Sequence, residues 1–418
     1  DITNYMTTAA FALLRHAADH RQEWLQRFYA IGKEAVRPRK DGEVAAYVLP
    51  PSLNREALLN IFRRAGVEVA WTQAFKLNGK DYDLGTVVIP LAQPYGAFAK
   101  ALLEPQHYPD LRNPSGQPIA PYDVTAHTLS LLMDVEAQPV FAPFKSPPPP
   151  SRPLPVPPSI ANQPRQVDYR LALYKSHVPS IDEGWTRWIL DNYNWTISTS
   201  PYTKGRINYT SLEDKEVRAG NLRAKYDAIV IPDQSPRAIL NGYRAGSMPP
   251  ELTGGLGAEG VRNLREFVEQ GGTLIALNQA SDFAIEQLHL PVRDITDGLP
   301  RTEYFAPGSI LRTEIDTTNP IAKGMPRESI AWVEDSPVFE FDARDADRVH
   351  VIARYPYHRP PLLSGWLLGD DKVRGRAALV EVNVGKGHVY LFGFRPQYRA
   401  QSLATYPLLF NAISQASK

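Results

Sequence analysis

The stretch at residues 257–292, "GAEGVRNLREFVEQGGTLIALNQASDFAIEQLHLPV", holds the pattern that decides the fold of this chain. Its first half has the apolar spacing of an amphipathic helix, and Gly271 and Gly272 predict a turn after it. The run at 273–278 has the continuous apolar character of a buried strand, and a second helix is expected to begin near Ser281. Helix, buried strand and helix in succession indicate an α/β fold with a mostly parallel sheet.

Toward the N-terminus the same alternation continues. Residues 4–36 have the apolar spacing of one long helix, which Pro38 would end. Strands are expected at 44–50 and 82–90, and a helix that Asn54 would cap begins between them. This spacing predicts parallel strand–helix–strand units in a first lobe.

Further buried strands are expected at 169–176 and 225–233. The second of these, "KYDAIVIPD", resembles "YDLGTVVIP" at 82–90, because both place Tyr-Asp before an apolar run that ends in Ile-Pro. A weak internal repeat and convergence on a common buried-strand pattern explain this similarity equally well. The region 374–394 reads as a hairpin closed at Gly-Lys-Gly, so antiparallel strands are expected near the end of the chain.

A proline-rich stretch, "SPPPPSRPLPVPPS" at 146–159, separates the two α/β patterns. Its composition favours polyproline II, and we favour an interdomain spacer over a ligand for a proline-binding module. The chain is therefore expected to comprise a helix-led α/β lobe (1–145), a linker (146–166) and a second α/β domain (167–418).

Composition excludes several classes of function. The net charge of +1 provides no general attraction to nucleic acid, and no apolar run is long enough to span a membrane. Cysteine is absent, which excludes disulfides, thiolate metal sites and a cysteine nucleophile. The chain shows no signal peptide and begins at Asp1, so we expect either processing or a longer parent protein.

Polar residues follow the expected strands of the second domain. Open parallel sheets bind ligands at the carboxyl ends of their strands, where such residues would line a crevice. The candidate crevice residues are Asp233, Gln234, Asn278, Gln279, Ser281, Asp282, Arg395 and Gln397. We assign no catalytic residue and no metal ligand among them.

The order of elements from residue 168 onward resembles the class I glutamine amidotransferase-like fold, which is flavodoxin-like. In that family a strand–turn–helix carries a nucleophilic Cys, and the last strand ends in His-x-Glu. The matching turn here is "LNQASDF" (277–283), which lacks Cys, and the matching strand end is "FRPQ" (394–397). Arg395 then stands for the His and Gln397 for the Glu. A guanidinium does not accept a proton near neutral pH, so the resemblance excludes amidotransferase activity.

Most of the chain also resembles the region downstream of the catalytic domain in large bacterial zinc carboxypeptidases. The stretches that carry this resemblance are 1–36, 93–110, 121–136, 252–292 and 392–402. In that family the zinc is bound upstream by His-x-x-Glu and a distant His, with a Glu as base. We expect no His-x-x-Glu pair and no such ligand set in this chain, and therefore no cofactor of its own.

The resemblance implies a non-catalytic accessory region that supports or orients an upstream zinc carboxypeptidase domain. It also implies a secreted or periplasmic location. The upstream domain is the expected partner, a homodimer is a further option, and no nucleic-acid partner is expected.

Two other interpretations of the second domain stay open. Ser281, beside Asp282, would form a hydrolase triad with His388 or His350, although a helix N-cap is the more ordinary role for a Ser before "DFAIEQL". A small-ligand-binding module would use Arg395 to pair an anionic group.

His16 and His20 have a helical spacing that can bind zinc, but no third ligand is evident. A surface or interface pair is therefore expected at these two residues.

Overall fold

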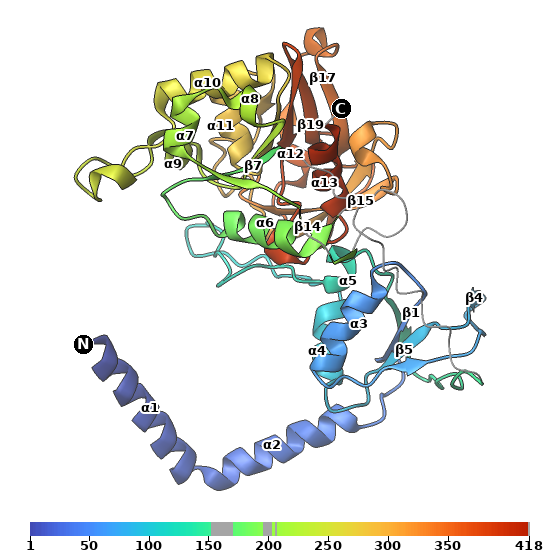
Figure 1. Cartoon of the computed structure of the whole chain (residues 1–418). Helices are drawn as coiled ribbons and strands as arrows, with labels where there is room; N and C mark the ends of the chain where they lie inside the picture. The colour runs from blue at the N-terminus through green and yellow to red at the C-terminus, as the bar shows by residue number, and fades with distance from the viewer. Residues whose placement is uncertain (152–169, 195–202, 205–206, 417–418) are drawn as a thin grey trace. The chain divides into compact units, whose positions relative to one another are not determined.

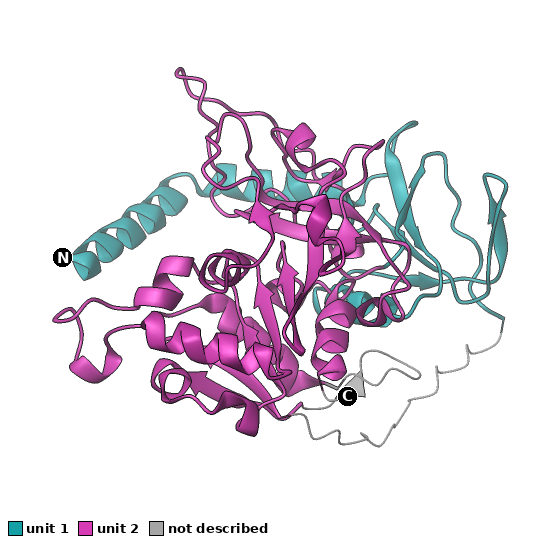
Figure 2. Ribbon diagram, turned by 90° about the horizontal axis from the view of Figure 1, so that it is seen from above, with its two compact units in different colours: residues 1–104, 135–155 teal, residues 105–134, 156–418 magenta. Residues whose placement is uncertain are grey.

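The computed structural model describes residues 1–151, 170–194, 203–204 and 207–416. By its internal contacts the chain forms two compact units, which are coloured separately in Figure 2. Unit 1 comprises Asp1–Glu104 and Val135–Pro155, and unit 2 comprises Pro105–Asp134 and Val156–Lys418. Most of the expected linker at 146–166 lies outside the described residues.

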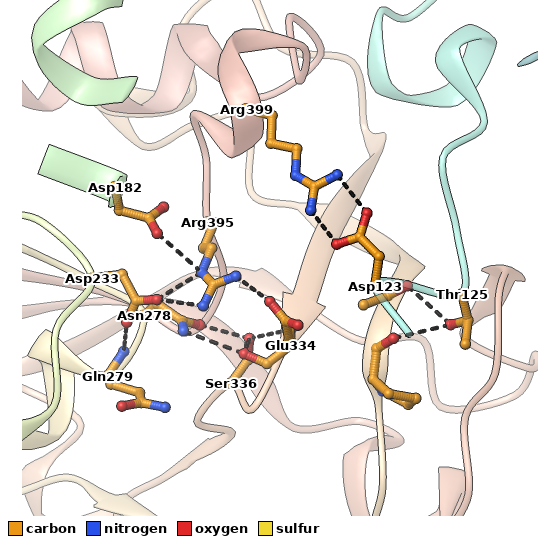
Figure 3. Close-up of polar contacts among 12 residues, drawn as sticks. Asp123, Thr125, Asp182, Asp233, Asn278, Gln279, Glu334, Ser336, Arg395 and Arg399 are labelled. Atoms are coloured by element: carbon orange, nitrogen blue, oxygen red, sulfur yellow. Dashed lines mark hydrogen bonds and ion pairs between the residues drawn. The ribbon is translucent and has the colours of Figure 1, made fainter. Parts of the chain in front are cut away.

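The segment 105–134 belongs by its contacts to unit 2, although the sequence pattern places it in the first lobe. The N–H of Gln106 donates to Ser364 Oγ at 2.8 Å, and Thr125 Oγ1 donates to the Gly308 carbonyl at 3.0 Å. Asp123 pairs with Arg399, with Oδ2 2.9 Å from Nη1 (Figure 3). These contacts join residues far apart in the sequence, which local periodicity does not reveal.

The expected single helix at 4–36 is in fact two helices, α1 (Ile2–Asp19) and α2 (Arg21–Val36). The backbone leaves helical geometry at His20, with φ −109° and ψ 25°, and Figure 1 shows the two helices meeting at an angle. His20 Nδ1 lies 3.0 Å from the His16 carbonyl oxygen, so this side chain caps the end of α1. The apolar spacing runs through the break, which is why the sequence reads as one helix.

The sheet of unit 1 is antiparallel, so the expected parallel units are wrong there. Strand β1 pairs antiparallel with both β5 and β6, and β2 pairs antiparallel with β5. Apolar content does not encode strand direction, and the expected strand at 82–90 is split between a small hairpin, β3–β4, and β5. The elements are β1 (Val44–Leu49), α3 (Arg55–Arg64), β2 (Ala70–Trp71), β3 (Phe75–Leu77), β4 (Lys80–Tyr82), β5 (Val87–Pro90), α4 (Gly96–Leu103) and β6 (Gln138–Phe141).

Unit 2 is built on a parallel sheet, as expected. The strand order β10-β7-β11-β12-β20 corresponds to 2-1-3-4-5 in chain order, which is the flavodoxin-like arrangement. The carboxyl ends of these five strands therefore share one edge of the sheet. The strands are β7 (Leu171–Lys175), β10 (Thr210–Glu213), β11 (Ala228–Ile231), β12 (Thr273–Leu277) and β20 (Gly387–Phe392).

Helices cover both faces of this sheet, which is why every residue of β11 and β12 is buried. Helices α7 to α11 contribute to one large apolar cluster with alternate residues of the strands, and Figure 1 shows α7, α8 and α10 stacked together beside the sheet. Helix α6 contacts β7, and α13 contacts β12. The helices are α6 (Ile181–Asn192), α7 (Asp214–Ala219), α8 (Leu222–Lys225), α9 (Pro236–Asn241), α10 (Gly257–Glu269), α11 (Ala280–Gln287) and α13 (Tyr406–Gln415).

Antiparallel strands extend the sheet beyond β20, as the hairpin pattern predicts. The order continues β20-β19-β17-β14-β15, and shorter strands pair at its margin. The main strands are β14 (Pro307–Ile315), β15 (Glu328–Glu334), β17 (Val349–Arg354) and β19 (Ala377–Val384), and the shorter ones are β13 (Arg293–Asp294), β16 (Phe339–Glu340) and β18 (Leu362–Ser364). Strand β15 brings its last residue, Glu334, to the edge where the parallel strands end.

The turn between α10 and β12 explains the paired glycines. Gly271 has φ +100°, a conformation that side chains disfavour. A Cβ on Gly272 would overlap the ring of Phe267, so only glycine lets the helix approach the strand this closely.

Across the residues described, no helix combines the length and the apolar character needed to cross a membrane.

Candidate functional site

Four elements of unit 2 bring charged side chains together at the carboxyl edge of the parallel sheet (Figure 3). Arg395 follows β20, Asp233 follows β11, Glu334 ends β15, and Asp182 lies in the first turn of α6, which follows β7. This edge is where open α/β sheets bind ligands. The cluster therefore occupies the place at which a functional crevice was expected.

Arg395 lies at the centre of this charged cluster. Its Nε and its Nη2 each lie 2.6 Å from Asp233 Oδ2, and its Nη1 donates to Glu334. Its Nε is 3.7 Å from Asp182 Oδ2. The central carbon of its guanidinium lies over the ring of Trp332, 5.4 Å from the ring centroid. The Arg395 side chain is only 16% exposed. Three carboxylates thus surround one largely buried guanidinium.

The electrostatics of the cluster follow from its burial. Burial raises the pKa of Asp182 to about 7; Arg395 opposes this rise, while Asp233 and Glu334 add to it. Burial alone would lower the pKa of Arg395, but the carboxylates of Asp233, Asp182 and Glu334 raise it instead. Arg395 therefore stays protonated and does not act as a base.

The tight turn after β12 is a strand-to-helix elbow, and Asn278 stands at its apex. Asn278 is fully buried with φ +52°, a left-handed conformation that asparagine tolerates better than most residues. Its Oδ1 accepts from Ser336 Oγ at 2.6 Å, and its N–H donates to the Phe392 carbonyl at 2.8 Å. Nucleophiles stand on such strained turns in hydrolases, but a carboxamide is not a nucleophile.

The other polar residues of the crevice bond to their neighbours. The N–H of Gln279 donates to Asp233 Oδ1 at 3.1 Å, and Gln234 Nε2 donates to the Val178 carbonyl at 2.9 Å. Gln397 is fully buried, and its Nε2 donates to Thr186 Oγ1 at 3.1 Å. The crevice residues thus act mainly as a connected polar network within the fold.

Ser281 is neither the expected helix cap nor an available nucleophile. Gln279 is the N-cap of α11, and Ser281 lies inside the first turn of the helix with no exposed surface. Its hydroxyl bonds to the carbonyl oxygens of Ala276 and Phe392, both at 3.1 Å. The N-cap expectation is therefore wrong.

Neither candidate histidine partner lies near Ser281. His388 pairs in register with Thr273 at the start of β12, whereas Ser281 follows the end of that strand. His388 Nδ1 lies 2.9 Å from Glu381 Oε1, and His350 Nε2 lies 3.3 Å from Asn383 Nδ2. A triad centred on Ser281 is not formed.

A cavity of about 540 Å³ lies beside the crevice within unit 2. Its lining includes Gln279, Asp282, Tyr304, Phe305 and Ser336. Burial raises the pKa of Asp282 to about 8, with the carboxylates of Asp294 and Asp297 adding to the effect. Asp282 is thus protonated in a large part of the molecules at neutral pH.

Several acidic residues around this cavity lack a cationic partner. Among the described residues, four acidic side chains of the lining form no hydrogen bond or ion pair. They are Asp282, Glu286, Asp297 and Asp335. The cluster around Arg395 shows the opposite behaviour, since each of its carboxylates is paired.

Some residues of the site were not predicted from the sequence. Glu334 and Asp182 complete the cluster around Arg395. Glu334 lies in a strand and Asp182 in a helix, and no sequence motif identifies either residue as part of a site. The only local signal was that each begins or ends an element at the ligand-binding edge of the sheet. The pairing itself depends on the fold.

The two histidines of the first helices lie side by side. The rings of His16 and His20 stack with centroids 4.2 Å apart. His20 and Glu23 do have the spacing His-x-x-Glu, contrary to the expectation that no such pair occurs, but Glu23 pairs with Arg27 at 2.5 Å. Over the described part of the chain, no three His, Asp or Glu side chains are grouped to hold one ion.

No protein-family model matches the chain, and no curated protein matches it either. Solved structures with similar traces include a ThuA-like protein from Bacteroides uniformis, at 13% identity and a TM-score of 0.33, covering 62% of this chain and 94% of that one. A GMP synthase component from Thermoplasma acidophilum shows 9% identity and a TM-score of 0.33, covering 59% and 93%.

A β-galactosidase from Bacillus circulans shows 14% identity and a TM-score of 0.33, covering 60% of this chain but 31% of the enzyme. At such low scores these neighbours say nothing about the activity of this chain. The strand order of unit 2 itself establishes an α/β fold of flavodoxin-like type with added antiparallel strands.

Proposed function

We propose that this chain is a non-catalytic accessory region of a secreted zinc carboxypeptidase, where it supports or orients an upstream catalytic domain. The observation that carries the non-catalytic part is the environment of Arg395, which is held by Asp233 and Glu334 at the strand end where a base would stand. Asn278 at the elbow offers no nucleophile in its place.

The carboxypeptidase parent rests on the sequence resemblance alone. That resemblance covers long segments of both units, among them 1–36 and 252–292. The parent would bind its zinc upstream of this chain, and a secreted or periplasmic location would follow from it. The role of this chain would then be to stabilise or position that domain rather than to take part in peptide hydrolysis.

A direct test measures hydrolysis of C-terminal peptide bonds, glutamine and simple esters by the purified chain. We expect no turnover above buffer. A serine-directed fluorophosphonate should also leave Ser281 unlabelled, because its hydroxyl is buried and bonded to two carbonyl groups. The proposal would be overturned if the purified chain showed turnover and if Asn278→Ala or Arg395→Met abolished that turnover.

A second test addresses the parent. The complete gene product is compared with a version that lacks residues 1–418. We expect zinc-dependent carboxypeptidase activity in the complete protein, and a lower yield or melting temperature of the catalytic domain when this region is removed. A gene that encodes no zinc-ligand pattern outside this chain would contradict the proposed parent.

The cavity beside the crevice supports a second candidate, a small-ligand-binding module. An anionic ligand would have to displace the carboxylates that already satisfy Arg395. In the lining of the cavity, Glu286, Asp294, Asp297 and Asp335 outnumber Arg293 and Arg301, which favours a cationic ligand instead. Its volume is within the range of small-molecule sites. The absence of a three-ligand group among the described residues favours an organic amine with spread charge over a single metal ion.

Thermal-shift measurements separate the two ligand chemistries. Spermidine, arginine and lysine are compared with sulfate and citrate at equal ionic strength, since a ligand of the folded state raises the melting temperature. A rise in melting temperature with the amines, which is smaller in the Asp297→Asn variant, would support this candidate. A shift with the anions alone would favour binding at Arg395.

A further inference from the structure

The first 36 residues carry an unusual concentration of exposed apolar side chains. Half of the 24 large hydrophobic residues that the structure shows as exposed lie here, and neither α1 nor α2 has a single buried residue. They are Ile2, Tyr5, Met6, Phe11, Leu13, Leu14, Trp24, Leu25, Phe28, Tyr29, Ile31 and Val36. The other exposed hydrophobic residues are distributed over the remaining described chain, as is normal for a protein surface.

These helices are not expected to be stable without a covering partner. Residues 2–14 contain no charged side chain, so this part of α1 has no ion pair to support it in water. Most helical stability in proteins comes from tertiary packing of the apolar face rather than from helix propensity. Figure 1 shows α1 and α2 meeting only at their junction, so they do not cover each other.

The spacing of the apolar residues indicates that the partner surface is helical. In α1, Ile2, Met6, Ala9 and Leu13 follow intervals of four, three and four residues. In α2, Trp24, Phe28, Ile31 and Ala35 follow the same intervals. This is the seam by which helices pack against other helices in coiled coils and bundles.

The charges of this segment favour a second copy over a charged partner. Residues 1–36 contain four acidic and four basic side chains, so the segment has no net charge at neutral His. Such a balance favours contact between two identical surfaces, because a net charge on the segment would make the two copies repel each other. An anionic membrane would instead select a basic polar face.

The available area suits a dimer. Of the five exposed aromatic residues of the segment, Trp24 and Phe28 lie on the α2 seam, and these two present on the order of 280 Å² together. A standard-size protein interface buries roughly 800 Å² on each partner, which the aliphatic residues of the two seams would complete.

From these observations we infer that α1 and α2 form a homodimerisation surface, in which the two seams of one chain pack against those of a second copy as a four-helix arrangement. This goes beyond the accessory role proposed above and does not depend on it, because a dimer would form whether or not the parent is a carboxypeptidase.

Sedimentation equilibrium over a range of micromolar concentrations tests the inference on the whole chain. We expect twice the chain mass of 46.7 kDa. The double variant Leu13→Glu/Phe28→Glu should be monomeric without loss of the thermal transition of unit 2. Leu84→Glu, which changes a 53% exposed residue of unit 1 outside the helices, should remain dimeric.

Cross-linking provides a second, independent readout, because the chain has no natural cysteine. A short bis-maleimide should join two chains of Ile31→Cys, on the α2 seam, and not of Lys33→Cys on the opposite side of the helix. A monomer at every concentration would overturn the inference, as would a dimer insensitive to Leu13→Glu/Phe28→Glu. Flotation of the monomer with lipid vesicles would assign the surface to a membrane instead.

Discussion

Arg395 Nη2 lies 2.6 Å from Asp233 Oδ2, which joins the end of the last parallel strand to the end of β11 across the sheet edge. In a working amidotransferase-like site this edge would have to stay open to a substrate. Here a cluster of charged side chains fills it, and this cluster of Arg395 with Asp182, Asp233 and Glu334 joins four elements of the fold. The predictions below follow from this relationship and from the turns that support it.

Replacement of Arg395 should destabilise unit 2 strongly. Arg395→Ala leaves Asp182, Asp233 and Glu334 clustered without their cation, and removal of one partner from a buried ion pair costs about 3–5 kcal/mol. Arg399→Ala is the matched control, because the pair of Arg399 with Asp123 is about half exposed and should cost about 1 kcal/mol or less. Urea denaturation of both variants measures the difference. Equal losses would show that the cluster around Arg395 has no special structural role.

The stability of the protein should fall as the pH rises through neutrality. Burial raises the pKa of Asp182 to about 7 in the folded state, above the usual value for an unfolded chain. Between about pH 4 and 7 the folded state therefore binds more protons than the unfolded state, and the free energy of unfolding decreases with pH. Asp282, whose pKa burial raises to about 8, acts in the same direction.

Two variants separate these contributions. Asp182→Asn should flatten the pH dependence between about pH 4 and 7, and Asp282→Asn should flatten it between about pH 4 and 8, as measured by urea denaturation at several pH values. Between about pH 7 and 8 only Asp282→Asn should have an effect. A steeper decline in either variant would mean that the carboxyl group is not protonated in the folded state as described.

The elbow at Asn278 should depend on backbone conformation more than on side-chain chemistry. Asn278→Ala places a less tolerant residue at φ +52° and removes the acceptor of the Ser336 hydroxyl, so a loss of about 2–3 kcal/mol is expected. Asn278→Gly removes the same hydrogen bond but relieves the backbone, so it should be the less destabilising change. Thermal unfolding compares the two. The reverse order would indicate that no strain is stored at this turn.

Gly272 should not tolerate even one added methyl group. A Cβ there would overlap the Phe267 ring and force α10 away from β12, with a loss of about 1–3 kcal/mol for Gly272→Ala. Gly184→Ala is the control, since this helical glycine has open space around its Cα and alanine favours helix. The control should be neutral or slightly stabilising in the same denaturation experiment. A neutral Gly272→Ala would contradict the close approach of helix and strand.

Local patterns in the chain were sufficient for much of unit 2. The helix at 257–269, the turn at Gly271 and Gly272, and the buried strand β12 follow from apolar periodicity and from glycine chemistry, both of which act over a few residues. The inability of Arg395 to act as a base is likewise a matter of residue identity. These features need no knowledge of distant parts of the chain.

Contacts between distant segments decided the rest. Strand direction in unit 1, the assignment of 105–134 to unit 2, and the pairing of Arg395 with Glu334 all join residues that are far apart in sequence. The burial of Ser281 depends in the same way on the Phe392 carbonyl, which lies on another strand. Apolar periodicity in the sequence indicates which residues are buried but not which residues they contact. The hydrogen bonds and ion pairs described here form only when the folded chain brings their partners together.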